Sequence, residues 1–105
     1  MFSGGDYDEV GRWLGNFVVS HAKRENPRVE AAVEAEGPRV GRNYGVRLRL
    51  GERSLPPLGA ESVELAFAEV RDNRGGIAWC QALSGRVRTL ARQLSDAERG
   101  ERRPA

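Results

Sequence analysis

The sequence contains one cysteine (Cys80), one histidine (His21) and one lysine (Lys23), and each scarcity excludes something. A single cysteine cannot form a disulfide within the chain, which excludes an internally cross-linked secreted scaffold and favours a cytoplasmic protein. One histidine and one cysteine cannot supply the closed ligand set of a structural zinc site, so we expect no metal. No glycine pattern of a phosphate loop or a dinucleotide-binding turn occurs, and we therefore expect no cofactor.

Long hydrophobic runs are also missing. No stretch of about 18 apolar residues occurs, so the sequence predicts no membrane-spanning helix and no membrane partner. Residues 1–8 contain neither a basic segment nor an apolar one, and we expect no signal peptide there. The 105 residues are 39% hydrophobic and 30% charged, which is typical of one small globular domain, and we assign residues 1–95 to it. Residues 96–105 are charged and lack apolar periodicity, which predicts a flexible tail.

Neither sign of charge dominates the chain. The 17 basic and 15 acidic residues leave a formal net charge of +2, and nearly all of the basic residues are arginine. Guanidinium groups suit phosphate binding, but a GC-rich genome would give the same bias. Acidic and basic blocks alternate along the sequence, which favours ion pairs within the fold over a strong external field.

A helix is predicted over residues 6–25. Asp6 and Glu9 form a capping-box pattern at its start, and apolar residues then recur at helical spacing until the next proline. Gly11 and Gly15 lie inside this helix, four residues apart. Such a pair marks the close approach of another element or is simply tolerated, and the sequence does not distinguish the two.

Three stretches with apolar residues at every second position predict three β-strands. They cover residues 28–36, 44–50 and 62–70. The proline-containing segment between the second and third stretches, residues 51–60, is predicted to be a loop.

A second helix is predicted over residues 77–95, because apolar residues fall on one helical face. These residues are Trp79, Leu83, Val87, Leu90 and Leu94. The pair Ser84-Gly85 leaves an alternative open, in which residues 77–82 form a fourth strand and a shorter helix follows.

The order of elements predicts an α+β fold, a two-layer αβββα sandwich. Its antiparallel three-stranded sheet would carry both helices on one face. On the other face, arginines of the central strand (Arg47, Arg49) would pair with glutamates of its neighbours (Glu30, Glu34, Glu64). The two unpaired edges of so small a sheet leave room for a homodimer.

One group of residues suggests contact with nucleic acid. Arginines gather in the first strand connection and around the second helix, beside a tyrosine that could stack on a base. The candidate contacts are Arg39, Arg42, Tyr44, Arg74, Arg88 and Arg92. The helix–three strands–helix order resembles the double-stranded-RNA-binding domain, and residues 37–51 look like the second-strand region of that family. The family places a lysine pair where Arg74 is followed here by two glycines, so the resemblance is one of topology.

His21 and Cys80 are the only classical base–nucleophile pair. No third orienting residue and no nucleophile-elbow pattern accompanies them, and core packing accounts for both. We therefore predict that the chain is not an enzyme but a small non-catalytic cytoplasmic protein-interaction module. Its partner would be an unknown protein or a second copy in a homodimer. A nucleic-acid-binding module is the main alternative, and an enzyme using Cys80 and His21 is the remote one.

Overall fold

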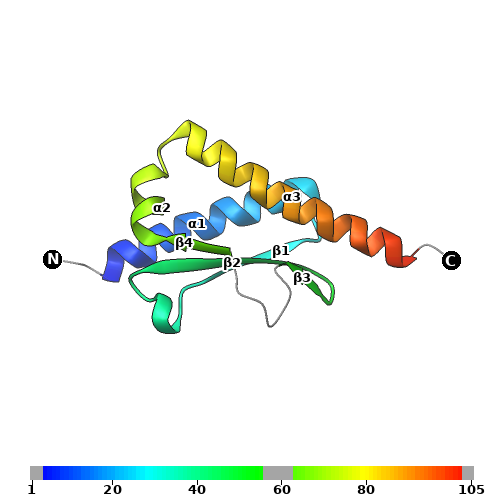
Figure 1. Ribbon diagram of the computed structural model, residues 1–105, viewed down its shortest axis with the longest axis horizontal. Coiled ribbons are helices and arrows are strands. Elements are labelled where there is room, and N and C mark those ends of the chain that lie inside the picture. Colours follow the sequence, from blue (N-terminus) through cyan, green and yellow to red (C-terminus); the bar gives the residue numbers. More distant parts are fainter. Residues whose placement is uncertain (1–3, 56–62, 103–105) are drawn as a thin grey trace.

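A layer of helices covers one face of an antiparallel sheet (Figure 1). The computed structural model describes residues 4–55 and 63–102. In chain order the elements are α1 (Gly4–Glu25), β1 (Glu30–Glu34), the 3₁₀ turn η1 (Gly37–Arg39), β2 (Asn43–Leu50), β3 (Arg53–Leu55), β4 (Val63–Ala66), α2 (Phe67–Asn73) and α3 (Ile77–Arg102). The predicted α+β class, with an antiparallel sheet and helices packed against it, is confirmed.

Strand β2 is the centre of the sheet. β1 pairs antiparallel with one edge of β2, in a register that places Glu30 opposite Arg49. The other edge of β2 is shared by two short strands: β4 pairs with the first half of β2, and β3 pairs with the second half. β3 and β4 therefore lie end to end along the same edge, and the predicted central position of residues 44–50 is confirmed.

Helix α1 packs on the sheet through residues spaced three and four apart. This buried stripe consists of Tyr7, Val10, Leu14, Val18 and Ala22. The helix ends at Glu25, as predicted, because the chain turns at Asn26 and Pro27. The Asn26 side chain accepts a 3.0 Å hydrogen bond from the Arg28 amide, which stabilises this turn.

Two tyrosines join α1 to β2. The rings of Tyr7 and Tyr44 stack with centroids 4.7 Å apart, and the Tyr44 hydroxyl donates a 2.6 Å hydrogen bond to the Tyr7 carbonyl. Gly11 permits this contact, because a Cβ added there would lie 2.9 Å from Cε1 of Tyr44. Of the two helical glycines, Gly11 thus marks a close approach. A Cβ on Gly15 would make only an ordinary 3.9 Å contact with Val33.

The third predicted strand is too long. Only Val63–Ala66 is extended, Ser62 lies outside the described residues, and the chain enters α2 at Phe67. Phe67 and Val70 are both buried, and a separation of three residues puts them on the same face only in a helix. The Phe67 amide donates a 2.7 Å hydrogen bond to the Arg42 carbonyl, just beyond the last paired residues of β4 and β2.

The prediction of a loop over residues 51–60 misses a strand. Gly51 has φ of +63°, a conformation that glycine adopts readily, and it turns the chain back so that β3 pairs with β2. Residues 56–60 lie outside the described residues.

Helix α3 is continuous, which confirms the prediction of one helix and overturns the alternative of a fourth strand. It does not end at Ser95, as the sequence predicted, but continues to Arg102. Arg28 forms a 2.8 Å ion pair with Glu98 in the added turns, and just before them Asn26 Nδ2 donates a 3.0 Å hydrogen bond to Ser95 Oγ. Residues 103–105 lie outside the described residues.

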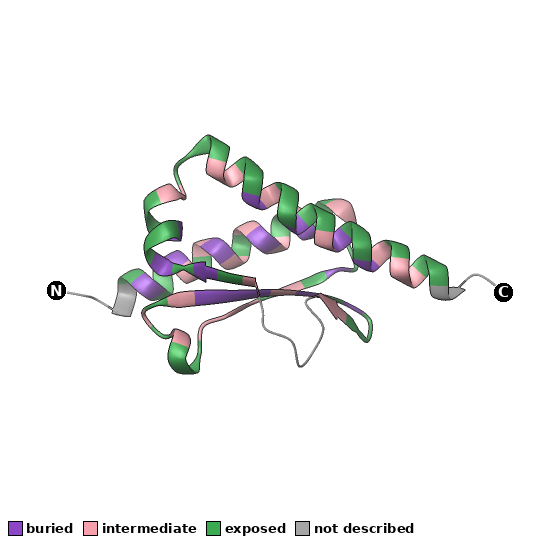
Figure 2. Cartoon of the chain, viewed as in Figure 1, coloured by how far each residue is buried: buried purple, intermediate pink, exposed green. Residues whose placement is uncertain are grey.

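The buried residues belong to the helices and to the strands that these helices cover (Figure 2). On the opposite face, Arg49 pairs with Glu30 at 2.5 Å and Arg47 with Glu34 at 3.8 Å, which confirms the predicted cross-strand pairs. Glu64 pairs instead with Arg39, outside the central strand. Such exposed pairs contribute about 0–1 kcal/mol each, so they help to fix the register more than they stabilise the fold.

Candidate functional site

Three of the six candidate nucleic-acid contacts are arginines engaged in ion pairs. Arg39 forms a two-pronged pair with Glu64, with Nε and Nη2 lying 3.0 and 2.8 Å from Oε2. Arg88 and Arg92 both contact Glu25, at 3.5 and 2.8 Å. The hydrogen bond from Arg92, together with the neighbouring positive charges, lowers the pKa of the Glu25 carboxyl. These three guanidinium groups are therefore partly neutralised within the fold.

The predicted role of Tyr44 in binding nucleic acid is wrong. Tyr44 was predicted to stack on a base, but it is fully buried against Tyr7 and offers no ring to a partner. Its neighbours in the sequence alternate in and out of the core, and Tyr44 falls on the inward-facing side of β2.

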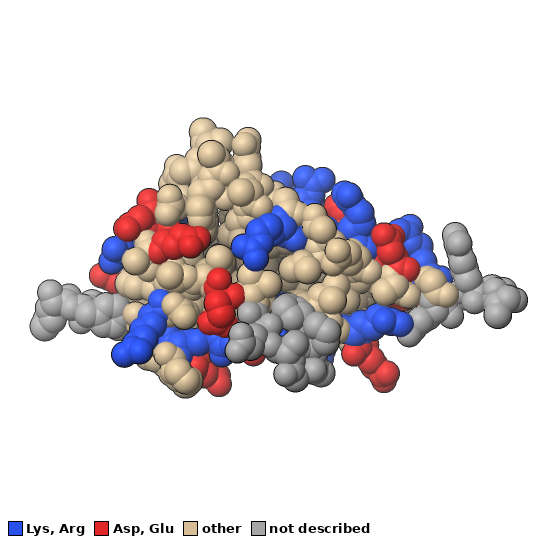
Figure 3. Space-filling model, viewed as in Figure 1, with Lys and Arg blue, Asp and Glu red and all other residues tan. Residues whose placement is uncertain are grey.

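Arg42 and Arg74 are the two remaining candidates. Neither forms an ion pair within the described part of the chain, and they belong to different elements, Arg42 next to β2 and Arg74 between α2 and α3. Figure 3 shows acidic and basic groups interleaved on the visible face, without a continuous basic patch. Because Tyr44 is buried, the six predicted contacts do not all lie on one surface.

His21 and Cys80 line the same hollow between α1 and the start of α3, which has a volume of about 270 Å³. The Cys80 thiol donates to the Arg74 carbonyl at 3.4 Å, and the His21 ring lies against Phe17 with centroids 4.4 Å apart. Burial, with the charges of Arg24 and Arg88, lowers the pKa of His21. No carboxylate is among the described residues that line this hollow, so no acidic group there orients the imidazole.

Four aromatic rings follow one another along the outer junction of α1 and α3. Trp13 stacks on Trp79 at 6.3 Å and on Phe17 at 5.2 Å, and Phe17 contacts His21. All four side chains are half-buried, and we refer to them as the aromatic cluster. Ile77 borders the adjoining hollow and is 76% exposed. This cluster is the largest concentration of accessible aromatic surface among the described residues.

The sequence placed Trp13 and Phe17 among the apolar positions of the first helix but did not single them out as a site. The buried stripe of α1 is complete without them, from Tyr7 to Ala22. Trp13 and Phe17 pack against this core as partly buried residues, so an apolar stripe wider than the fully buried one is the signal that could have revealed the cluster.

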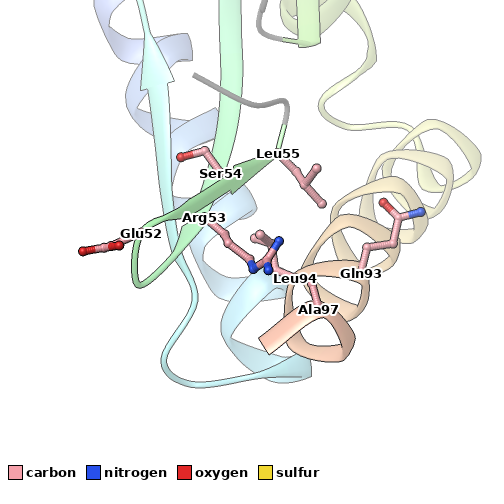
Figure 4. A pocket seen from close by; sticks show the side chains of 7 residues that line it. All are labelled: Glu52, Arg53, Ser54, Leu55, Gln93, Leu94 and Ala97. Carbon is pink, nitrogen blue, oxygen red and sulfur yellow. The ribbon is translucent and has the colours of Figure 1, made fainter. Parts of the chain in front are cut away.

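A second depression lies between β3 and α3 (Figure 4). It has a volume of about 470 Å³, with Leu55 and Leu94 facing each other and Arg53 directed toward the helix. A neighbouring hollow of about 540 Å³ shares Gln93 with it. Residues 56–62 connect the two strands that border these hollows, and they lie outside the described residues, so we assign no site here.

Residues 4–55 and 63–102 contain neither a candidate metal site nor a candidate membrane span. No group of three or more histidine, cysteine, aspartate or glutamate residues in these ranges could hold a metal ion. No helix there is both long enough and apolar enough to cross a membrane.

Comparisons with known proteins return no relative. No protein-family model, no curated protein and no solved structure matches this chain.

Proposed function

We propose that this chain is a non-catalytic module that binds a protein partner through the aromatic cluster. The observation that carries the proposal is Ile77, which is 76% exposed beside a hollow and next to the stacked rings. Covering a side chain of this size contributes about 1.5–3 kcal/mol. Contiguous apolar surface of this kind is typical of protein-binding sites, and tryptophan is enriched at their energetic centres.

The rings are held in place before any partner binds. Trp79 donates a hydrogen bond from Nε1 to Glu69 at 3.2 Å, and Trp13 is packed between Trp79 and Phe17. Side chains that are already ordered lose little conformational entropy on binding. The adjoining hollow, with Phe17 and Ile77 on its walls, would accept an apolar side chain of the partner.

The alternatives have less support. The ion pairs of Arg39, Arg88 and Arg92 weaken the case for phosphate binding. The case for catalysis is weakened because the described residues that line the hollow of His21 include no carboxylate to orient its ring. Within this proposal we retain the cytoplasmic location expected from the single cysteine.

The chain offers a matched pair of variants as a test. Val40 is the other large apolar side chain that is mostly exposed in the described part of the chain, at 61%. It follows η1, whereas Ile77 begins α3, and Figure 1 places these two elements on opposite sides of the sheet. Neither Ile77→Ser nor Val40→Ser removes a core contact, so both variants should fold.

A photo-crosslinking amino acid placed at Ile77 or at Val40 identifies what each surface contacts in cells. The captured protein, or a second copy of this chain, is then titrated with purified wild type and variants. We expect Ile77→Ser to weaken binding at least tenfold and Val40→Ser to leave it unchanged. Equal effects of the two variants, or no crosslinked protein specific to the Ile77 position, would overturn the proposal.

A further inference from the structure

A hollow opens between α1 and the first turns of α3. Figure 1 shows that α3 diverges from α1 toward its start, and the hollow of about 270 Å³ lies between them. Phe17 lines it from α1, and Ile77 and Cys80 line it from α3, so we refer to it as the Cys80 hollow. It is smaller than the roughly 300–1,000 Å³ of a typical small-molecule pocket, so it fits one inserted side chain better than a free ligand.

The Cys80 hollow is accessible from the side of α3. Ile77 is 76% exposed, and Gly75, Gly76 and Gln81, which also line the hollow, are exposed. Trp13, by contrast, is half-buried where α1 and α3 pack together. The accessible surface beside the aromatic cluster therefore lies at this hollow rather than along α1.

The charges around the Cys80 hollow have one sign. α1 carries no acidic residue over residues 10–24, and α3 carries none over residues 77–95. Arg74 and His21 line the hollow, whereas no carboxylate is among the described residues that line it. An acidic partner would therefore meet no carboxylate on these walls.

Two of the neighbouring positive charges are available to a partner. Neither Arg74 nor Arg24 forms an ion pair with any residue that the structure describes, and the charge of Arg24 acts on His21. The next carboxylate along α1, Glu25, is already held by two arginines of α3. Carboxylates of a partner could thus pair with Arg74 and Arg24 without displacing an ion pair of the fold.

From these observations we infer that the partner of the aromatic cluster is an acidic segment of another protein, with an apolar side chain that enters the Cys80 hollow. The inference rests on the proposed function, since it names the chemistry of the partner that the same surface binds. The apolar side chain would lie between Phe17 and Ile77, and carboxylates beside it would pair with Arg74 and Arg24. Complementary charge around an apolar site contributes to specificity and to the rate of association, and its effect weakens as salt rises.

Selection from a phage-displayed library of random linear peptides tests the inference. On the wild-type chain, the selected peptides should combine a large apolar residue with aspartate or glutamate close to it. Fluorescence anisotropy of the best peptide, synthesised with a label, then measures its affinity for purified variants. Arg74→Glu should weaken binding about three- to tenfold, because like charges then face each other, and Ile77→Ser should weaken it as well.

The chain offers a matched control for the charge change. Arg86→Glu makes the same substitution in α3, but Arg86 is exposed and lines the neighbouring hollow beside Val63 instead. This variant should bind the peptide as the wild type does. A second selection, performed on Arg74→Glu, should lose the preference for acidic peptides.

Different results overturn different statements. Peptides that require Ile77 but show no excess of acidic residues overturn this inference and leave the proposed function in place. If no peptide is enriched, or if binding is unchanged in Ile77→Ser, the inference is also wrong, and the protein that crosslinks to Ile77 then decides the proposed function. An equal loss in Arg86→Glu would show a general charge effect and count against the inference.

Nucleic acid is the remaining outcome. A short single-stranded RNA or DNA that binds more tightly than every selected peptide, and that loses affinity in Arg74→Glu, would assign this surface to nucleic acid and overturn both proposals. Acidic peptides that depend on Arg74 and Ile77, and that bind more weakly in about 0.5 M salt, support the inference.

Discussion

The rings of Tyr7 and Tyr44 lie nearly parallel, with an angle of 8° between their planes, and the Tyr44 hydroxyl donates to the Tyr7 carbonyl. The Tyr7 hydroxyl in turn lies 2.6 Å from the Asn43 carbonyl. The helix and the central strand are thus joined in both directions by tyrosines whose side chains are buried. Two predictions about stability follow from this contact.

The first prediction concerns alkaline pH. Burial raises the pKa of Tyr44 to about 12 and also raises the pKa of Tyr7. Tyrosines of the unfolded chain ionise near pH 10, so between about pH 10 and 12 the folded chain retains protons that the unfolded chain has lost. The contribution of these two tyrosines to the free energy of unfolding should therefore be constant below about pH 9 and fall as pH rises above 10.

Urea denaturation between pH 7 and 11.5 measures this decline. Tyr44→Phe should lower the free energy of unfolding by about 1 kcal/mol at pH 7, because it removes a buried hydrogen bond. The same variant should show a shallower decline above pH 10. A decline as steep as that of the wild type would mean that Tyr44 ionises freely in the folded protein.

The second prediction compares two glycines in helices. Gly11→Ala should destabilise the protein by about 1–3 kcal/mol, because the new Cβ would lie 2.9 Å from Cε1 of Tyr44. Gly85→Ala should instead stabilise it by about 0.5–1 kcal/mol, because no atom lies within 4 Å of the added Cβ and alanine favours a helix. Thermal unfolding of both variants checks the opposite signs, and a stabilising Gly11→Ala would contradict the packing described here.

The third prediction concerns Glu25 and nucleic acid. Because Glu25 holds Arg88 and Arg92, the wild-type chain should bind short duplex RNA or DNA only weakly in fluorescence anisotropy. Glu25→Gln releases both guanidinium groups, so it should raise the affinity for nucleic acid at low salt. The slope of log affinity against log salt should steepen by up to about two units, because each released arginine can neutralise one phosphate. Micromolar binding by the wild type, with a salt slope of several units, would restore the nucleic-acid alternative.

The fourth prediction concerns Cys80. Its side chain is half-buried and donates to the Arg74 carbonyl, so a thiol reagent should react with the native protein more slowly than with the protein in urea. A native thiol that reacts faster than the unfolded one would favour the enzyme alternative.

The sequence predicted the central strand and the cross-strand pair of Arg49 and Glu30 from alternation and charge. It favoured a continuous second helix, which the structure has, but left a fourth strand open at Ser84-Gly85. The start of α2 was not predicted, because Val63, Leu65 and Phe67 alternate as they would in one strand. Only the burial of Val70 on the same side as Phe67 distinguishes the helix, and that requires the tertiary structure.

The candidate site was harder to predict for a similar reason. Arginines are visible in a sequence, but the glutamates that neutralise them are not adjacent: Glu25 and Arg92 are far apart along the chain and meet at 2.8 Å. The aromatic cluster likewise depends on the crossing of two helices, which brings Trp79 to Trp13. Periodicity alone assigns both residues to the core.

The arrangement of β3 and β4 along one edge of β2 has a consequence for how the molecule opens. β2 is the only described strand that is hydrogen-bonded along both sides, by β1 on one side and by the two short strands in turn on the other. Either short strand can detach while the other remains paired, so fraying at this edge should proceed in two separate steps. The amides of β2, such as those of Val46 and Leu48, should then be the last in the sheet to exchange with deuterium.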